Sequence, residues 1–159
     1  MSRACLALVF CVTGATAGGC LAPIYSHGRA AEASAVSYYA AWKITGDLKD
    51  LHKAHDNSVS TAAVSPQTYA NAAFTIDLGR SCLFNMVVID HGANEYGYAR
   101  RTAVMVSSDG KVFTPQYAAP GTRRVTVLSW LTPVMARYIR IQALTPGDRT
   151  WSVAEVYVM

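Results

Sequence analysis

Phe74-Thr75-Ile76-Asp77-Leu78-Gly79 opens the part of the sequence, residues 73–159, that decides the fold. Apolar side chains alternate with polar ones and a glycine follows, which is typical of a strand with one face on a core. Ser108-Asp109-Gly110 predicts a tight hairpin turn, because Asp and Gly tolerate positive φ values. Further strand-like runs cover residues 84–91, 102–108, 111–117, 123–131, 136–144 and 151–158. Regularly spaced strands with turn signals predict an all-β sandwich or jelly roll.

Composition limits what else the chain can be. Its 159 residues fit one domain, and 52% apolar residues are enough for a packed core. The net charge of +4 is spread along the sequence, with adjacent basic residues only at Arg100-Arg101 and Arg123-Arg124. Because nucleic-acid binding needs a clustered basic stripe, we expect no nucleic-acid partner.

The N-terminus predicts export. Arg3 precedes a short apolar run and then small residues, so residues 1–20 are expected to be a signal. The apolar run is too short to span a bilayer. Ala15-Thr16-Ala17 has the form of an ordinary cleavage site, whereas Ala17-Gly18-Gly19-Cys20 is similar to a lipoprotein box that would lipidate Cys20. Both alternatives predict a secreted or cell-envelope protein.

Two further segments complete the expected organisation. Residues 21–35 are rich in Ala, Ser and Gly, which is typical of a flexible tether. Residues 36–159 then form the folded domain.

Four ordered segments, residues 74–79, 106–111, 136–141 and 151–156, resemble the discoidin family, also called the coagulation-factor 5/8 C-terminal type domain. With residues 54–61 upstream, the resemblance extends over residues 36–159. Bacterial members of this family include carbohydrate-binding modules with the galactose-binding-like fold. The resemblance implies an eight-stranded antiparallel jelly-roll β-sandwich, with a ligand held by loops at one end.

Residues 56–61 place several oxygen donors in one loop, which is the kind of segment that encloses a hard cation such as calcium. The resemblance implies a structural calcium site in which this loop is joined by a carboxylate of the last strand. The expected ligands are Asp56, Ser58, Thr61 and Glu155. The alternative is that Asp56 and Asn57 only cap a turn, as such residues often do.

His52 and His55 lie beside Asp56, and imidazole with carboxylate also suits zinc. A zinc enzyme would need a third strong ligand and a general base. The other histidines, His27 and His91, stand far away in the sequence. We therefore expect His52 and His55 to flank a short helix and face solvent.

The loop over residues 91–101 has the mixture that sugar recognition requires. Aromatic faces cover the apolar side of a sugar ring, and polar side chains give directional hydrogen bonds to hydroxyls. From this loop and from the resemblance, the candidate ligand-binding residues are His91, Asn94, Tyr96, Tyr98, Arg100 and Trp151. The alternatives are loop packing for Tyr96 and Tyr98, and core burial for Trp151.

Three function classes follow. A non-catalytic glycan-binding or adhesion module leads, with a glycan as the expected partner and calcium as the expected cofactor. A protein-interaction or structural module of the same fold in a surface assembly is the alternative. An enzyme is third, since the sequence has no Gly-x-Ser-x-Gly elbow, phosphate loop or paired-carboxylate motif.

Overall fold

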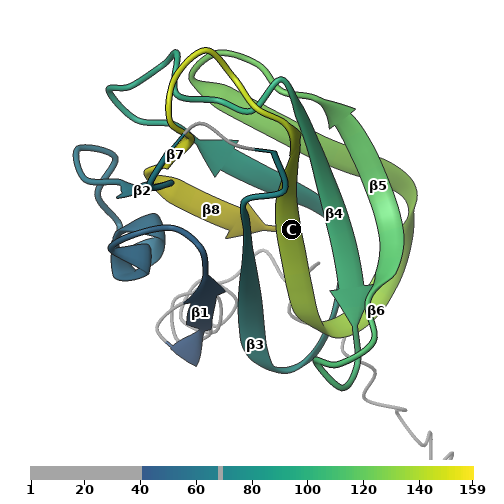
Figure 1. Ribbon diagram of the computed structural model, residues 1–159. Coiled ribbons are helices and arrows are strands. Elements are labelled where there is room, and N and C mark those ends of the chain that lie inside the picture. Colours follow the sequence, from purple (N-terminus) through teal and green to yellow (C-terminus); the bar gives the residue numbers. More distant parts are fainter. Residues whose placement is uncertain (1–40, 68–69) are drawn as a thin grey trace, which may run out of the picture.

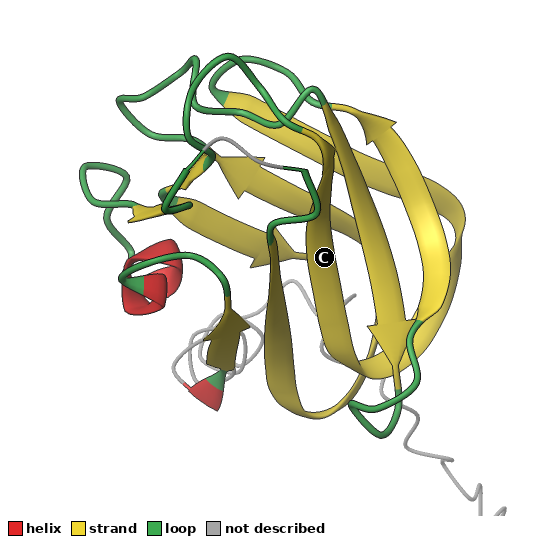
Figure 2. Ribbon diagram, in the orientation of Figure 1, coloured by secondary structure: helices red, strands yellow, loops and turns green. Residues whose placement is uncertain are grey.

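The computed structural model describes residues 41–67 and 70–159. The expected export signal (1–20), its possible anchor Cys20 and the tether (21–35) lie outside the described residues. Strands account for most of the described chain (Figure 2). Figure 1 shows their arrangement; the elements are β1 (Lys43–Gly46), the 3-10 helix η1 (Leu51–His55), β2 (Ala63–Val64), β3 (Ala73–Asp90), β4 (Arg101–Ser107), β5 (Thr114–Pro120), β6 (Val125–Thr145), β7 (Ser152–Val153) and β8 (Glu155–Val158).

All strand pairs are antiparallel. The main sheet has the order β1-β3-β6-β4-β5, and β8 pairs with β3 outside this path. The short strands β2 and β7 form a second sheet of two strands. These pairings confirm the expected all-β antiparallel fold. In residues 41–67 and 70–159, no helix is long and apolar enough to cross a membrane.

The two layers of the sandwich arise because β3 and β6 are long and bent (Figure 1). The register of this pair shifts between Asp77 and Cys82 and again between Phe84 and Met86. Residues 73–77 pair with β1 and the end of β6, whereas residues 86–90 pair with the start of β6 and with β8. Each long strand therefore contributes to both layers, as strands with irregular registers do at sandwich corners.

This bending corrects the sequence prediction of separate strands over 74–78 and 84–91, and over 123–131 and 136–144. Gly79 has a φ of 78°, and the chain turns there without leaving the strand. A glycine after an alternating run looks like a strand end, although the backbone can also bend at a glycine and resume pairing.

The core lies between the layers. Inward residues of the neighbouring strands β3 and β6 lie side by side on the core face, as Ile76 does with Ile139 and Phe74 with Ile141. All four are almost completely buried. Burying each such side chain contributes about 1.5–3 kcal/mol. The Trp151 ring packs against Phe74 in this core, with ring centroids 5.5 Å apart.

The expected hairpin between β4 and β5 is present, with a longer connection than predicted. β5 begins at Thr114, so residues 108–113 join the strands. Gly110 has a φ of 73°, and the Asp109 carboxylate accepts hydrogen bonds from the N–H groups of Lys111 and Val112 at 2.8 and 3.1 Å. This turn lies at the end of the sandwich opposite residues 91–100 (Figure 1).

Candidate functional site

Several loops meet at one end of the sandwich because of the strand register. Asp90, the last residue of β3, pairs with Val125 at the start of β6 and with Glu155 at the start of β8. The connections over 91–100, 121–124 and 146–151 therefore converge, and the loop over 56–61 approaches from the other side (Figure 1). We call this the loop end.

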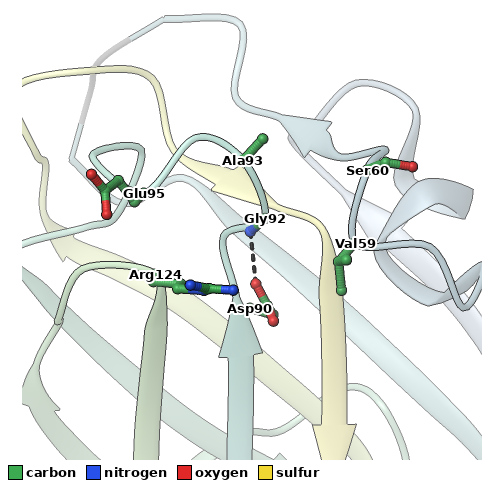
Figure 3. Close-up of a pocket in the computed structure, with 7 residues that line it drawn as sticks. All are labelled: Val59, Ser60, Asp90, Gly92, Ala93, Glu95 and Arg124. Atoms are coloured by element: carbon green, nitrogen blue, oxygen red, sulfur yellow. Dashed lines mark hydrogen bonds between the residues drawn. The ribbon is translucent and has the colours of Figure 1, made fainter.

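The loop end contains a pocket of about 480 Å³. Two carboxylates, one guanidinium, one hydroxyl and two apolar side chains surround it, so both hydrogen-bond donors and acceptors are available (Figure 3). The Asp90 carboxylate accepts a 2.7 Å hydrogen bond from the Gly92 N–H. The pocket is lined by Val59, Ser60, Asp90, Gly92, Ala93, Glu95 and Arg124.

Gly92 allows the loops on both sides of the pocket to approach. Its φ is 61°, and a Cβ there would lie 2.5 Å from the Val59 carbonyl oxygen and 2.8 Å from the Ala154 Cβ. Only glycine tolerates both the conformation and the contact. The wall formed by residues 56–61 therefore depends on this glycine.

Arg124 is held at the pocket by its backbone. Its φ of 63° is uncommon for a long side chain. The Arg124 carbonyl accepts the His91 N–H at 2.7 Å, and the Arg124 N–H donates to the Glu95 carbonyl at 3.3 Å. These bonds fix residues 121–124 against residues 91–100 and direct the Arg124 side chain toward the pocket (Figure 3).

Of the predicted ligand-binding residues, His91 and Trp151 lie inside the protein. His91 is 1% exposed; its Nδ1 donates to the Ser152 carbonyl at 2.6 Å and its Nε2 bonds the Thr126 hydroxyl at 2.9 Å. Burial lowers the pKa of the His91 imidazole below its usual value. Trp151 is 4% exposed and packs on Phe74. The structure thus gives both side chains internal packing positions, with neither exposed to a ligand.

The other predicted residues lie on the surface of the loop end, beside the pocket lining. Tyr96 is 42% exposed. Tyr98 accepts a 2.6 Å hydrogen bond from Arg100, whose guanidinium also forms an ion pair with Asp148. Asn94 folds back against Gly97, since a Cβ on that glycine would lie 2.4 Å from the Asn94 amide nitrogen.

Sequence reasoning missed the residues that line the pocket. Arg124 was assigned to a strand beginning at residue 123, although β6 begins at Val125 and Arg124 belongs to the preceding loop. Asp90 is the last residue of its strand, immediately before the loop over 91–101 from which the candidate residues come. Ser60 stands within the expected calcium loop. For Asp90 and Arg124, the position next to a strand end was the available signal.

The structure brings the four expected calcium ligands together. The Ser58 N–H donates to Asp56 Oδ1 at 2.9 Å and to Glu155 Oε1 at 2.8 Å, while the Thr61 hydroxyl donates to Asp56 Oδ2 at 2.7 Å. The hydrogen bond from Thr61 is the main reason that the pKa of Asp56 lies below its usual value. Glu155 is fully buried.

The oxygen atoms of this set are of the type that calcium prefers. Two carboxylates lie at one N–H group, one of them without solvent exposure, and hydroxyl and carbonyl oxygens surround them. A hard cation would offset their charge and prefers such oxygens. No group of three or more His, Cys, Asp or Glu side chains that could hold a metal ion occurs in the described part of the chain, so the proposed site relies on hydroxyl and carbonyl oxygens beside its two carboxylates.

Comparisons with known proteins agree with this fold. The sequence model of the F5/8 type C domain matches residues 32–156. A comparison with curated protein sequences finds no match.

Several solved structures with the same fold are bacterial carbohydrate-binding modules. CpGH89CBM32-5 from Clostridium perfringens, in complex with GalNAc-β-1,3-galactose, has 18% identity and a TM-score of 0.64, covering 74% of this chain and 93% of that one. The family 32 module of C. perfringens NanJ, in complex with galactose, has 18% identity and a TM-score of 0.60, covering 74% and 90%. Chitosan-binding module 1 of a Paenibacillus sp. IK-5 chitosanase/glucanase, solved as a point mutant, has 21% identity and a TM-score of 0.62, covering 74% and 91%. At these identities the likeness establishes the fold.

Proposed function

Because the chain belongs to the F5/8 type C domain family, we propose that it is a non-catalytic carbohydrate-binding module whose glycan occupies the pocket at the loop end. The pocket is the observation that carries this proposal. It lies between loops, outside the packed core, and has room for a sugar ring at about 480 Å³.

The chemistry of the lining supports a sugar. Vicinal hydroxyls need acceptors and donors close together, and here the Glu95 carboxylate accepts while the Arg124 guanidinium donates. Val59 is 52% exposed and offers an apolar surface to the C–H face of the ring. The three relatives described above were solved with, or are named for, carbohydrate ligands, which supports the same ligand class for this chain.

The proposal includes a structural calcium ion held by Asp56, Ser58, Thr61 and Glu155. When bound, the ion would neutralise the two carboxylates and stabilise the contact between residues 56–61 and β8. Since Val59 and Ser60 of the same loop line the pocket, the ion would also fix one wall of the binding site.

Secretion or anchorage at the cell envelope, by cleavage of the export signal or through Cys20, is also part of the proposal. Mass spectrometry of the mature N-terminus would distinguish cleavage before residue 20 with lipidation from simple signal removal. An unprocessed protein retained in the cytoplasm would contradict this part alone.

A glycan array tests the proposed function, followed by calorimetry with the best ligand. Arg124→Asn removes the guanidinium and keeps a residue that tolerates positive φ, so the fold should persist. Losing a hydrogen bond to a charged group costs about 1.5–3 kcal/mol, which is roughly a tenfold or greater loss of affinity. Lys111→Asn, at the opposite end, is the control. No binding to any neutral or acidic glycan would overturn the proposal.

A further inference from the structure

Two arginines from different loops meet on one exposed tyrosine at the loop end. The Arg123 Cζ lies 4.3 Å from the centroid of the Tyr96 ring, and the Arg149 Cζ lies 5.6 Å from the same centroid. Arg123 follows β5 and Arg149 precedes β7, so the fold brings them together from distant positions in the sequence. We call Tyr96, Arg123 and Arg149 the arginine shelf.

The positive charge of the shelf is not neutralised within the described residues, where neither Arg123 nor Arg149 forms an ion pair. By contrast, two other arginines of the described residues form ion pairs, Arg100 with Asp148 and Arg137 with Asp77. Arg123 and Arg149 are both exposed. Two like charges on one ring repel each other, which favours an anion that contacts both.

The carboxylates near the arginine shelf do not neutralise the charge of Arg123 and Arg149. Asp148 is paired with Arg100, and Asp90 accepts a hydrogen bond from Gly92 within the pocket. Glu95 is exposed and lines the pocket with Asp90 and Arg124, and within the described residues it forms no ion pair with Arg123 or Arg149.

Guanidinium groups suit planar or tetrahedral oxyanions. The tyrosine ring holds each guanidinium over its face, with an attraction of about 0.5–1 kcal/mol at an exposed site. A guanidinium in this position keeps its N–H edge for bidentate hydrogen bonds to a carboxylate or a sulfate. Tyr96 thereby orients both groups before a ligand arrives.

The shelf borders the pocket. Tyr96 follows the pocket residue Glu95, Arg123 precedes the pocket residue Arg124, and the Arg124 N–H donates to the Glu95 carbonyl. A sugar in the pocket would therefore carry its neighbouring unit toward the arginine shelf.

We propose that this protein binds an acidic glycan, with one sugar in the pocket and a carboxylate or sulfate group on Arg123 and Arg149. This inference rests on the proposed carbohydrate function and adds the charge class of the ligand. Membranes and nucleic acids also carry anions, but a pocket with hydroxyl-matching groups beside the shelf favours a glycan.

Calorimetry with three oligosaccharides tests the inference: a neutral galacto-oligosaccharide, an oligogalacturonate that carries carboxylates, and a carrageenan oligosaccharide that carries sulfates. At least one acidic ligand should bind about tenfold more tightly than the neutral one at low salt, and this advantage should shrink as salt rises. The acidic oligosaccharide that binds more tightly shows whether the shelf prefers a carboxylate or a sulfate.

The double variant Arg123→Gln/Arg149→Gln should lose this advantage and keep the affinity for the neutral ligand. Lys43→Gln/Lys111→Gln removes the same charge elsewhere and should behave like the wild type. Arg123→Lys/Arg149→Lys, which keeps the charge, should recover part of the affinity; unchanged thermal unfolding checks that each variant folds.

Three results would overturn the inference. Neutral binding equal to acidic binding would reject the shelf and leave the proposed function intact. No binding to any oligosaccharide would reject both. Shelf-dependent binding to duplex DNA or to phosphatidylserine vesicles, without binding to the acidic oligosaccharides, would assign the shelf to another partner.

Discussion

Glu155, fully buried at the start of β8, accepts a 2.8 Å hydrogen bond from the Ser58 N–H, which lies 97 residues earlier in the chain. The same N–H also donates to Asp56. This contact joins the loop that forms one wall of the pocket to the last strand. It makes Glu155 the residue on which the stability of that wall should depend.

Glu155→Gln keeps the size of the side chain and removes its charge, so we expect it to abolish stabilisation by calcium. At calcium a hundredfold above the dissociation constant, the wild type should gain about 2.7 kcal/mol in free energy of unfolding. Calorimetric unfolding with calcium or with a chelator measures this gain. Asp109→Asn, an exposed carboxylate at the far hairpin, is the control. A wild type that calcium does not stabilise would reject the site.

Gly92→Ala should destabilise the protein and weaken glycan binding, because the new Cβ would meet the Val59 carbonyl at 2.5 Å. Gly79→Ala is a matched control: its φ is also positive, at 78°, but nothing lies within 4 Å of the added Cβ. Conformational strain alone costs about 1–2 kcal/mol, so Gly92→Ala should cost more than Gly79→Ala. Chemical denaturation measures both, and equal losses would contradict the close approach.

The pH dependence of the free energy of unfolding should reflect the protonation of His91. Burial lowers the pKa of its imidazole below 6.5 in the folded protein, whereas the unfolded chain keeps the ordinary value. The unfolded state then binds more protons, so this contribution is complete above about pH 6.5 and is lost as the pH falls toward the folded pKa. His91→Gln should remove this slope, and the exposed His52→Gln should retain it. An unchanged slope in His91→Gln would contradict the assignment.

The ion pair at the bend of β3 should matter more than an exposed one. Arg137 donates two hydrogen bonds to Asp77, at 2.8 and 2.9 Å, and Asp77 also accepts the Gly79 N–H. Arg137 is the main reason that the pKa of Asp77 lies below 3.8. The stabilisation is therefore present above pH 3.8 and is lost as the pH falls through the folded pKa.

Asp77→Asn should accordingly lower the unfolding temperature at pH 7 more than Asp50→Asn, which breaks the exposed pair with Lys53. The difference between the two variants should vanish at low pH. Equal effects at pH 7 would show that the bend does not depend on Asp77.

The fold was predictable because apolar and polar side chains alternate in most strands. The bends within β3 and β6 were not predictable. Gly79 looks like the end of a strand, and pairing beyond it depends on β6, much later in the chain. The proposed calcium ligands rest on the family resemblance alone, since Asp56 and Glu155 share no local pattern in the sequence. For the pocket, the convergence of separate loops is a tertiary property that neither periodicity nor composition records.

For His91, the sequence itself contains a signal of burial. Val87, Ile89 and His91 occupy alternate positions along the chain, and all three are buried. The period of two therefore placed His91 on the core face, although its polar side chain and the loop after it suggested a ligand contact.

The central claim, that a glycan binds in the pocket at the loop end, is tested most directly by an NMR titration. The ¹⁵N-labelled protein is titrated with the galacto- and galacturono-oligosaccharides. Binding in the pocket predicts shifts of the backbone N–H signals of Ser60, Gly92, Glu95 and Arg124, with those of Gly110 and Lys111 at the opposite end unchanged. Shifts confined to the opposite end, or no shifts with either sugar, would contradict it.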